Sequence, residues 1–219
     1  MKRIIAFIFI TLTAILIAYF STKDKKKPLP IINPIDVNSE MVDEDLLRKG
    51  YGHTIGDFCF INQEGKTITQ NDMQDKIVVV EYFFTTCMTI CPKMNIQMQR
   101  VNEHFKGNDD FKILSFTVNP EVDTVEQMKR YAEAHKANSN QWHFLTGEKE
   151  KLYHLARTSF FVLKPAEAQN LGDAGNDFIH TNNFVLIDKQ KRIRGYYDGT
   201  SVKETNQMIL DIEELMTEK

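Results

Sequence analysis

The sequence has little net charge, few cysteines and no internal repeat. Its 219 residues carry 27 basic and 30 acidic side chains, a formal net charge of −3. So small an imbalance argues against a nucleic-acid partner. Three cysteines allow at most one dithiol pair, with one thiol left over. The hydrophobic fraction of 42% is sufficient for one core of ordinary domain size.

A long apolar run occupies the start of the chain. Lys2 and Arg3 precede an uncharged stretch from Ile4 to Phe20, close to the minimum length of a membrane-spanning helix. No small-x-small cleavage site follows, which favours an uncleaved anchor over residues 1–21 rather than a cleaved signal peptide. No cysteine ends the run, so we expect no lipoprotein anchor. We expect a single pass through the cytoplasmic membrane, with the remaining chain on the periplasmic, extracytoplasmic side.

The next segment, residues 22–44, is predicted to be a linker. Pro28, Pro30 and Pro34 oppose helix formation, and no apolar period develops between them. Such a composition is typical of a tether. We therefore place the folded domain at residues 45–219.

Within that domain, hydrophobic periodicity predicts alternating strands and helices. The expected strands are 57–61, 66–69, 77–84, 111–118, 142–145, 184–187 and 193–197, and the expected helices are 92–105, 124–135, 148–157 and 201–216. Crossover helices between the central strands predict a parallel pair, and the last two strands form an antiparallel hairpin. This order predicts an α/β, thioredoxin-like fold with an added N-terminal β-hairpin.

Two cysteines lie directly after the predicted central strand. The sequence Cys87-Met88-Thr89-Ile90-Cys91-Pro92 gives a C-x-x-x-C spacing, one residue longer than that of dithiol oxidoreductases. Pro92 suits the first helical position, which makes Cys91 the expected N-cap. Both sulfurs would then lie near the positive end of the helix dipole, which favours their thiolate forms. The site falls at the carboxyl edge of the sheet, where α/β folds usually bind ligands.

One distant histidine is expected at the same edge. His180 precedes the apolar run Phe184 to Ile187. If that strand runs antiparallel to the strand at residues 77–84, its start lies beside the end of that central strand. Cys87, Cys91 and His180 would then meet.

Two thiolates and one imidazole are soft ligands that suit copper in both of its common oxidation states. Zinc would need a fourth protein ligand or a bound water, and no fourth protein ligand is evident. A thiol-disulfide reductase using Cys87 and Cys91 is the alternative, although no proline occupies residues 179–183, where thioredoxin-type enzymes need one. A peroxidase of the same fold is a weaker third interpretation.

Other chemically notable residues have simpler interpretations. We expect Met88 to pack in its loop, Met94 and Met98 to form a core stripe, and Cys59 to be a small buried residue. The other five histidines are expected on the surface or on helix faces: His53, His104, His135, His143 and His154. Asn119 and Asp123 are expected in a turn and a helix cap.

Several motifs together resemble the Sco/SenC family of copper proteins. They are Cys-x-x-x-Cys-Pro with its Phe-rich strand, Thr117-Val118-Asn119-Pro120-Glu121-Val122-Asp123-Thr124, and His180-Thr181-x-x-Phe184-Val185-Leu186-Ile187-Asp188. The resemblance covers about residues 50–217, and in one departure Asn119 stands where the family usually has Asp.

The resemblance implies a membrane-anchored, thioredoxin-like copper chaperone. Its copper ligands would be Cys87, Cys91 and His180. Its partner would be the copper-site subunit of cytochrome c oxidase, or another cuproprotein, to whose dinuclear site it delivers copper or whose thiols it reduces.

Overall fold

A computed structural model describes residues 11–16, 28–162 and 182–218. These residues form one seven-stranded sheet in the order β2-β1-β5-β4-β3-β6-β7. The strands are β1 Cys59–Asn62, β2 Thr67–Thr69, β3 Ile77–Phe83, β4 Phe111–Thr117, β5 Trp142–Thr146, β6 Asn183–Ile187 and β7 Ile193–Asp198. The helices are η1 Pro34–Asp36, η2 Ser39–Met41, α2 Glu44–Lys49, η3 Gln70–Met73, α3 Cys91–His104, α4 Val125–Ala134, α5 Lys149–Thr158 and α6 Val202–Thr217.

The centre of the sheet is the buried strand β3. Every residue of β3 is buried, as its β-branched and aromatic composition predicts. It pairs in parallel with β4 and antiparallel with β6, and β4 pairs in parallel with β5. The predicted parallel pair, the closing hairpin of β6 and β7, and the first hairpin of β1 and β2 are all present. The expected thioredoxin-like α/β fold is thereby confirmed.

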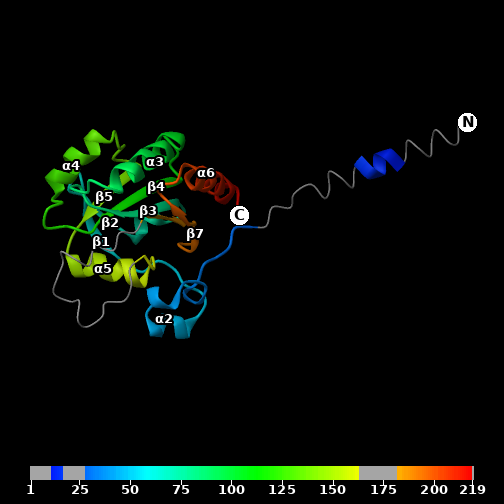
Figure 1. Ribbon diagram of the computed structural model, residues 1–219, viewed down its shortest axis with the longest axis horizontal. Helices are drawn as coiled ribbons and strands as arrows, with labels where there is room; N and C mark the ends of the chain where they lie inside the picture. The colour runs from blue at the N-terminus through cyan, green and yellow to red at the C-terminus, as the bar shows by residue number, and fades with distance from the viewer. Residues whose placement is uncertain (1–10, 17–27, 163–181, 219) are drawn as a thin grey trace, which may run out of the picture.

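Helices cover the two sides of the sheet unequally (Figure 1). We call the side under α3, α4 and α6 the α3 face, and the side under α5 and the segment before β1 the α5 face. Val79 and Phe83 of β3 point to the α3 face, where they pack with Met98 of α3. Val80 of β3 points to the α5 face, where Leu152 of α5 covers it. One strand therefore supplies both cores by simple alternation.

Local sequence signals explain where several elements begin and turn. The Thr124 hydroxyl accepts a hydrogen bond from the Gln127 N–H at the start of α4, as an N-cap does. The Ser201 hydroxyl accepts one from the Glu204 N–H at the start of α6. Gly65 has φ +71° in the turn between β1 and β2, a conformation that favours glycine.

The segment from residue 28 to 44 packs on the domain instead of forming the predicted tether. Ile32 forms a β-bridge with Ile193 of β7. The Arg194 guanidinium donates hydrogen bonds to the carbonyls of Leu29 and Pro30, and Val42 is buried in the α5-face core. The prolines do exclude a long helix. The composition of the segment could not show that it pairs with β7, which follows it by about 160 residues in the sequence. The domain boundary at residue 45 remains a prediction.

The expected membrane helix lies mostly outside the described residues. Of the run from Ile4 to Phe20, residues 11–16 are described, and they are helical. Across the described parts of the chain, no helix combines the length and the apolar character that a membrane crossing requires.

The structure contradicts the burial predicted for Cys59 and the exposure predicted for His143. Cys59 is exposed, because Phe58 and Phe60 take the buried side of the strand and alternation turns Cys59 the other way. His143 is buried in β5 and not on the surface, and its Nδ1 lies 3.2 Å from Asn62 Nδ2. By contrast, Met94 and Met98 form the core stripe that their spacing predicts.

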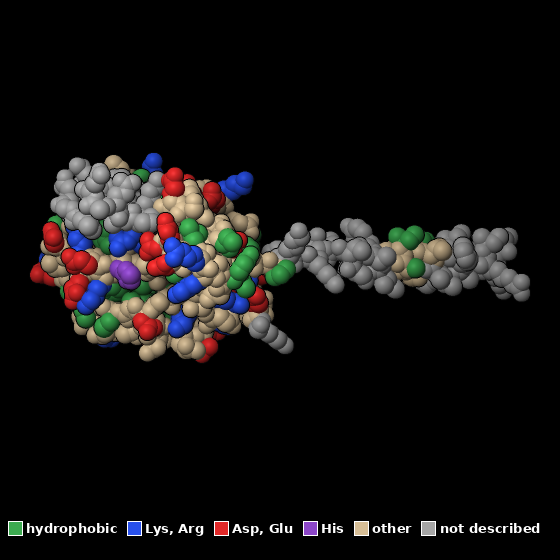
Figure 2. Space-filling view, turned by 90° about the horizontal axis from the view of Figure 1, so that it is seen from below, with side chains coloured by type: hydrophobic (Ala, Val, Ile, Leu, Met, Phe, Trp, Pro, Cys, Tyr) green, Lys and Arg blue, Asp and Glu red, His purple; other side chains and the backbone are tan. Residues whose placement is uncertain are grey.

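The domain's surface is charged in both signs. Figure 2 shows basic and acidic side chains interspersed over the described part of one face. Such a mixture is ordinary for a solvated surface.

Candidate metal centre

The two predicted thiols meet where β3 gives way to α3. The Cys87 N–H donates to the Phe84 carbonyl across 3.2 Å, which turns the chain sharply after the strand. The Cys91 N–H in turn donates to Cys87 Sγ across 3.4 Å. Both thiols are free, and Cys87 and Cys91 are only 7% and 3% exposed. The structure thus holds two reduced sulfurs side by side beneath the surface.

The helix begins one residue earlier than predicted. Cys91 is the first residue of α3 and Pro92 the second, and Ile90 takes the N-cap position. The expected N-cap role of Cys91 is therefore wrong. The first N–H groups of a helix have no partner within it. As the first residue of α3, Cys91 therefore has a backbone N–H available to donate to the Cys87 sulfur.

The surroundings separate the two thiols chemically. Burial raises the pKa of Cys87, but hydrogen bonds from the Cys91 thiol and N–H and from Thr89 outweigh it and leave the pKa below its ordinary value. Burial and the Cys87 sulfur hold the pKa of Cys91 far above its ordinary value. The expectation of two favoured thiolates thus agrees with the structure at Cys87 and is wrong at Cys91, where burial outweighs the helix dipole.

A buried carboxyl that sequence analysis missed lies on the same face. Glu81 of β3 accepts a hydrogen bond from the Ser115 hydroxyl across 2.6 Å, and Ser115 accepts one from the Trp142 indole. Among the described residues, Glu81 Oε2 has no partner. Burial raises the pKa of Glu81 to about 7. The sequence does contain a signal that could have identified Glu81, because it is the one charged residue inside the apolar run Ile77 to Phe84.

Asp123, which the sequence predicts in a helix cap, is also buried. It is 0% exposed. Its carboxylate accepts hydrogen bonds from the N–H and hydroxyl of Thr85 and from the hydroxyl of Thr117. Thr124 caps α4, and the Asn119 carbonyl closes the turn before it, as the Asn119 prediction requires. Sequence spacing could not show that Thr85 lies beside Asp123, because the contact depends on the pairing of β3 with β4.

Met88, between the two cysteines, projects into solvent. Its side chain is 88% exposed, so the predicted packing is wrong. Val122 in the loop after β4 is likewise exposed. The buried sulfurs therefore lie under a surface that includes an exposed thioether.

His180 lies outside the described residues. The relation on which its placement rests is present, since β6 runs antiparallel to β3 with Val80 opposite Val185. The described chain resumes at Asn182, two residues after His180 in sequence. Within the described ranges, no cluster of three or more His, Cys, Asp or Glu side chains could hold a metal ion. The meeting of His180 with the thiols stays a prediction.

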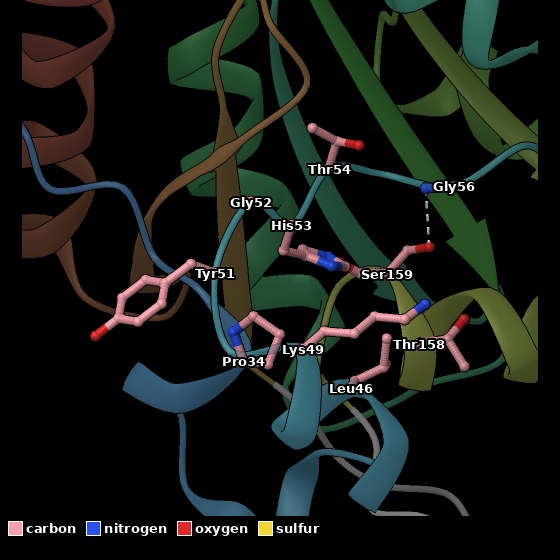
Figure 3. A pocket seen from close by; sticks show the side chains of 10 residues that line it. All are labelled: Pro34, Leu46, Lys49, Tyr51, Gly52, His53, Thr54, Gly56, Thr158 and Ser159. Carbon is pink, nitrogen blue, oxygen red and sulfur yellow. Dashed lines mark hydrogen bonds between the residues drawn. The ribbon is translucent and has the colours of Figure 1, made fainter.

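A surface pocket lies apart from the cysteines, between α2 and the end of α5 (Figure 3). The ring of His53 lies 2.8 Å from the Ser159 carbonyl, and the Gly56 N–H donates to the Ser159 hydroxyl. Burial lowers the pKa of His53. Since no cysteine lines this pocket, it is not the centre that the sequence predicts.

Comparison with known proteins supplies a family. The model of the SCO1/SenC family matches residues 48–217. A SCO1 protein homologue from Bacillus subtilis is 30% identical over 164 residues, which cover 74% of this chain and 82% of the relative.

Solved structures show the same fold. A structure of BsSco is 28% identical with a TM-score of 0.64, and the match covers 76% of this chain and 95% of that one. That protein is described as having a disulfide switch and as a member of the Sco family of cytochrome c oxidase assembly proteins. The structure of ScoI from Arabidopsis thaliana with copper bound is 24% identical, has a TM-score of 0.56, and covers 73% of this chain and 98% of that one. At 24% identity, the likeness to the Arabidopsis structure shows a shared fold and nothing further.

Proposed function

The chain belongs to the SCO1/SenC family, and from that premise we propose that it binds copper through Cys87, Cys91 and His180 and acts as a copper chaperone. The copper is cargo for the copper-site subunit of cytochrome c oxidase or for another cuproprotein. A 28% identical relative described as a member of the Sco family of cytochrome c oxidase assembly proteins supports this role.

The observation that carries the proposal is the hydrogen bond from the Cys91 backbone N–H to Cys87 Sγ, across 3.4 Å. It brings the two buried cysteines together at the edge of the sheet, so that both sulfurs are available as soft donors. Paired thiolates suit Cu(I), and an added imidazole makes the set acceptable to Cu(II). The residues present therefore fit a copper ion.

The antiparallel pairing of β6 with β3 supports His180 as the third ligand. Val185 lies opposite Val80, so toward its start β6 approaches the end of β3, from which the cysteine loop leaves. His180 stands three residues before Asn183, the first residue of β6. That short separation keeps the imidazole within reach of the same edge.

The proposal includes attachment to the cytoplasmic membrane. Residues 1–21 form a single-pass anchor, residues 22–44 connect it, and residues 45–219 hold the copper site on the periplasmic side. The uncharged run from Ile4 to Phe20 supports the anchor. Extraction of membranes with alkaline carbonate should leave the full chain in the pellet and release a chain that begins at residue 28. Equal release of both chains would remove the anchor from the proposal.

Copper loading tests the ligand set. The full chain, reduced and loaded anaerobically with Cu(I), should retain one copper per molecule after desalting. Cys87→Ser and Cys91→Ser should lose it, whereas Cys59→Ser, which alters an exposed thiol, should retain it.

The His180→Ala variant completes that test. It should lose or strongly shift the thiolate-to-Cu(II) charge-transfer bands, and His154→Ala, at an exposed helix position, should keep them. Unchanged Cu(II) binding by His180→Ala would refute the proposed ligand set.

A second function, thiol-disulfide reduction, is favoured by the unequal thiols. The lowered pKa of Cys87 and the raised pKa of Cys91 suit a nucleophile and a resolving thiol. The Cys87 thiolate would attack a partner disulfide, and Cys91 would then displace the partner and give up its proton. Two electrons would pass to the partner, and a Cys87–Cys91 disulfide would remain. Equal reduction of a disulfide by wild type and His180→Ala, without stable copper binding, would favour this function.

A further inference from the structure

We propose that Asp123 is a positioning residue that fixes the loop carrying Cys87 and thereby sets the redox potential and copper affinity of the thiol pair. The inference rests on the proposed function for its copper part. Its redox part concerns the cysteines alone.

The geometry of the contact is specific. Asp123 Oδ1 and Oδ2 each lie 3.2 Å from the Thr85 nitrogen, and Oδ1 lies 2.5 Å from Thr85 Oγ1. Oδ2 also accepts from Thr117 Oγ1 across 2.5 Å. Thr85 is the second residue of the loop after β3 and stands two residues before Cys87, and Thr117 ends β4. One carboxylate therefore ties the cysteine loop to the neighbouring strand.

Helix α4 strengthens the same contact. The Gln127 amide donates to Thr85 Oγ1 across 3.2 Å, so the Thr85 hydroxyl both donates to Asp123 and accepts from α4. The Asn119 N–H donates to Thr117 Oγ1, which orients that hydroxyl toward the carboxylate. The position of Thr85 is thus defined from two directions.

The carboxylate depends on these neutral donors. No ion pair to Asp123 is formed by any residue in the described ranges, and the side chain is fully buried. A buried carboxylate requires its hydrogen bonds, because an unmet acceptor keeps its full desolvation cost. Loss of one donor should therefore move the loop until the carboxylate finds a replacement, rather than leave the geometry unchanged.

Loop position matters because sulfur chemistry is sensitive to geometry. The Cys87 sulfur accepts a hydrogen bond from the Cys91 N–H across 3.4 Å and lies 3.8 Å from the Thr89 hydroxyl oxygen, so its position depends on the conformation of this loop. Disulfide formation requires a narrow range of separations and torsions, and a strained bond is more readily reduced. A shift at Thr85 is transmitted through one intervening residue, Thr86. The Thr85–Asp123 contact should therefore alter the thiol pair without touching either sulfur.

The test is the equilibrium between the Cys87–Cys91 pair and glutathione, measured on the full, copper-free chain with Cys59→Ser as the common background. Thr85→Val, which removes the hydroxyl, and Asp123→Asn should each shift the equilibrium constant by ~10-fold or more. Thr85→Ser restores the donor and should stay within about 2-fold of wild type. Cu(I) affinity, measured by competition with a chelator, should follow the same order.

Asp188→Asn is the matched control. Asp188 is also buried and accepts several hydrogen bonds, but it lies in the turn between β6 and β7 and pairs with Arg194. The Asp188→Asn variant should have a lower free energy of unfolding, but its equilibrium constant with glutathione should stay within about 2-fold of wild type. If Asp123→Asn does not fold, the pair Thr85→Val and Thr85→Ser carries the test.

Two results would overturn the proposal. One is an unchanged equilibrium constant in Thr85→Val, and the other is a shift in Asp188→Asn as large as that in Asp123→Asn. If wild type binds no copper while Thr85→Val still shifts the thiol equilibrium, the copper function fails and the positioning role stands.

Discussion

The two faces of the sheet are built from the same strands but carry different chemistry. On the α3 face, Cys87 and Cys91 join an apolar cluster, and the pKa of Cys91 is raised by burial first, then by the Cys87 sulfur and to a smaller extent by the buried Glu81. On the α5 face, the core cluster contains no cysteine among its described members. The two cysteines lie on this face because α3, which begins at Cys91, packs against this side of the sheet, and alternation along β3 turns Glu81 to the same side.

Each face also buries one titratable group, and burial shifts the two groups in opposite directions. Burial raises the pKa of Glu81 to about 7 on the α3 face. It lowers the pKa of His143 to about 4, and alternation with Leu145 puts His143 on the α5 face. In both cases the neutral form is favoured, because desolvation penalises charge whatever its sign.

The largest effect is expected from Leu152→Ala, which should lower the stability of the domain without changing its copper binding. Leu152→Ala opens a cavity in the α5-face core, where Leu152 is fully buried, and should lower the free energy of unfolding by about 2–5 kcal/mol. Urea unfolding measures this loss, and copper per chain should be unchanged below the transition. If copper binding fell in proportion to stability, the faces would not be functionally distinct.

Glu81→Gln should remove one of two opposing contributions to the pH dependence of stability. Glu81 releases its proton near pH 4.5 when unfolded and near pH 7 when folded, so the native state binds more protons in between. Glu81 by itself should therefore lower the free energy of unfolding by about 3 kcal/mol as pH rises from 4.5 to 7. Glu81→Gln should lack this contribution, so its stability should rise with pH more steeply than that of wild type, whereas Glu103→Gln, at an exposed position, should keep the wild-type profile. Urea unfolding of the copper-free, reduced chain at several pH values makes the comparison.

His143→Gln should remove the opposing contribution. The imidazole is neutral in the folded state down to about pH 4 but binds a proton near pH 6.5 when unfolded. Stability from this residue is therefore lost as pH falls from 6.5 to 4, again by about 3 kcal/mol. In wild type the contributions of Glu81 and His143 oppose each other between about pH 4.5 and 6.5. The free energy of unfolding of each single variant should therefore change more steeply with pH than that of wild type, rising with pH in Glu81→Gln and falling in His143→Gln. Identical profiles for His143→Gln and wild type would show that burial does not perturb this imidazole.

The smallest effect is expected at Met88. Because its side chain is 88% exposed, Met88→Ser should change the free energy of unfolding by no more than about 0.5 kcal/mol. Copper per chain should also stay at the wild-type value, since the proposed ligands do not include the thioether. A loss of copper in Met88→Ser would add a sulfur donor to the α3-face site.

Hydrophobic periodicity and residue spacing predicted the features that depend on residues close together in the sequence. The apolar run of β3 and the hairpins lie where periodicity places them, and α3 begins within one residue of its predicted start. Cys87 and Cys91 lie close together, as their spacing between this strand and this helix predicts. The burial of Asp123 could not be predicted, because it depends on the pairing of β3 with β4. The docking of residues 29–42 likewise depends on Arg194 and Ile193, which lie far away in sequence.

X-ray absorption at the copper edge, on the full chain loaded with Cu(II), identifies the atoms bound to the copper ion. We predict two sulfur ligands and at least one nitrogen ligand, with the nitrogen lost in His180→Ala and one sulfur lost in Cys87→Ser. A coordination shell of nitrogen and oxygen alone would contradict a copper site built on Cys87 and Cys91.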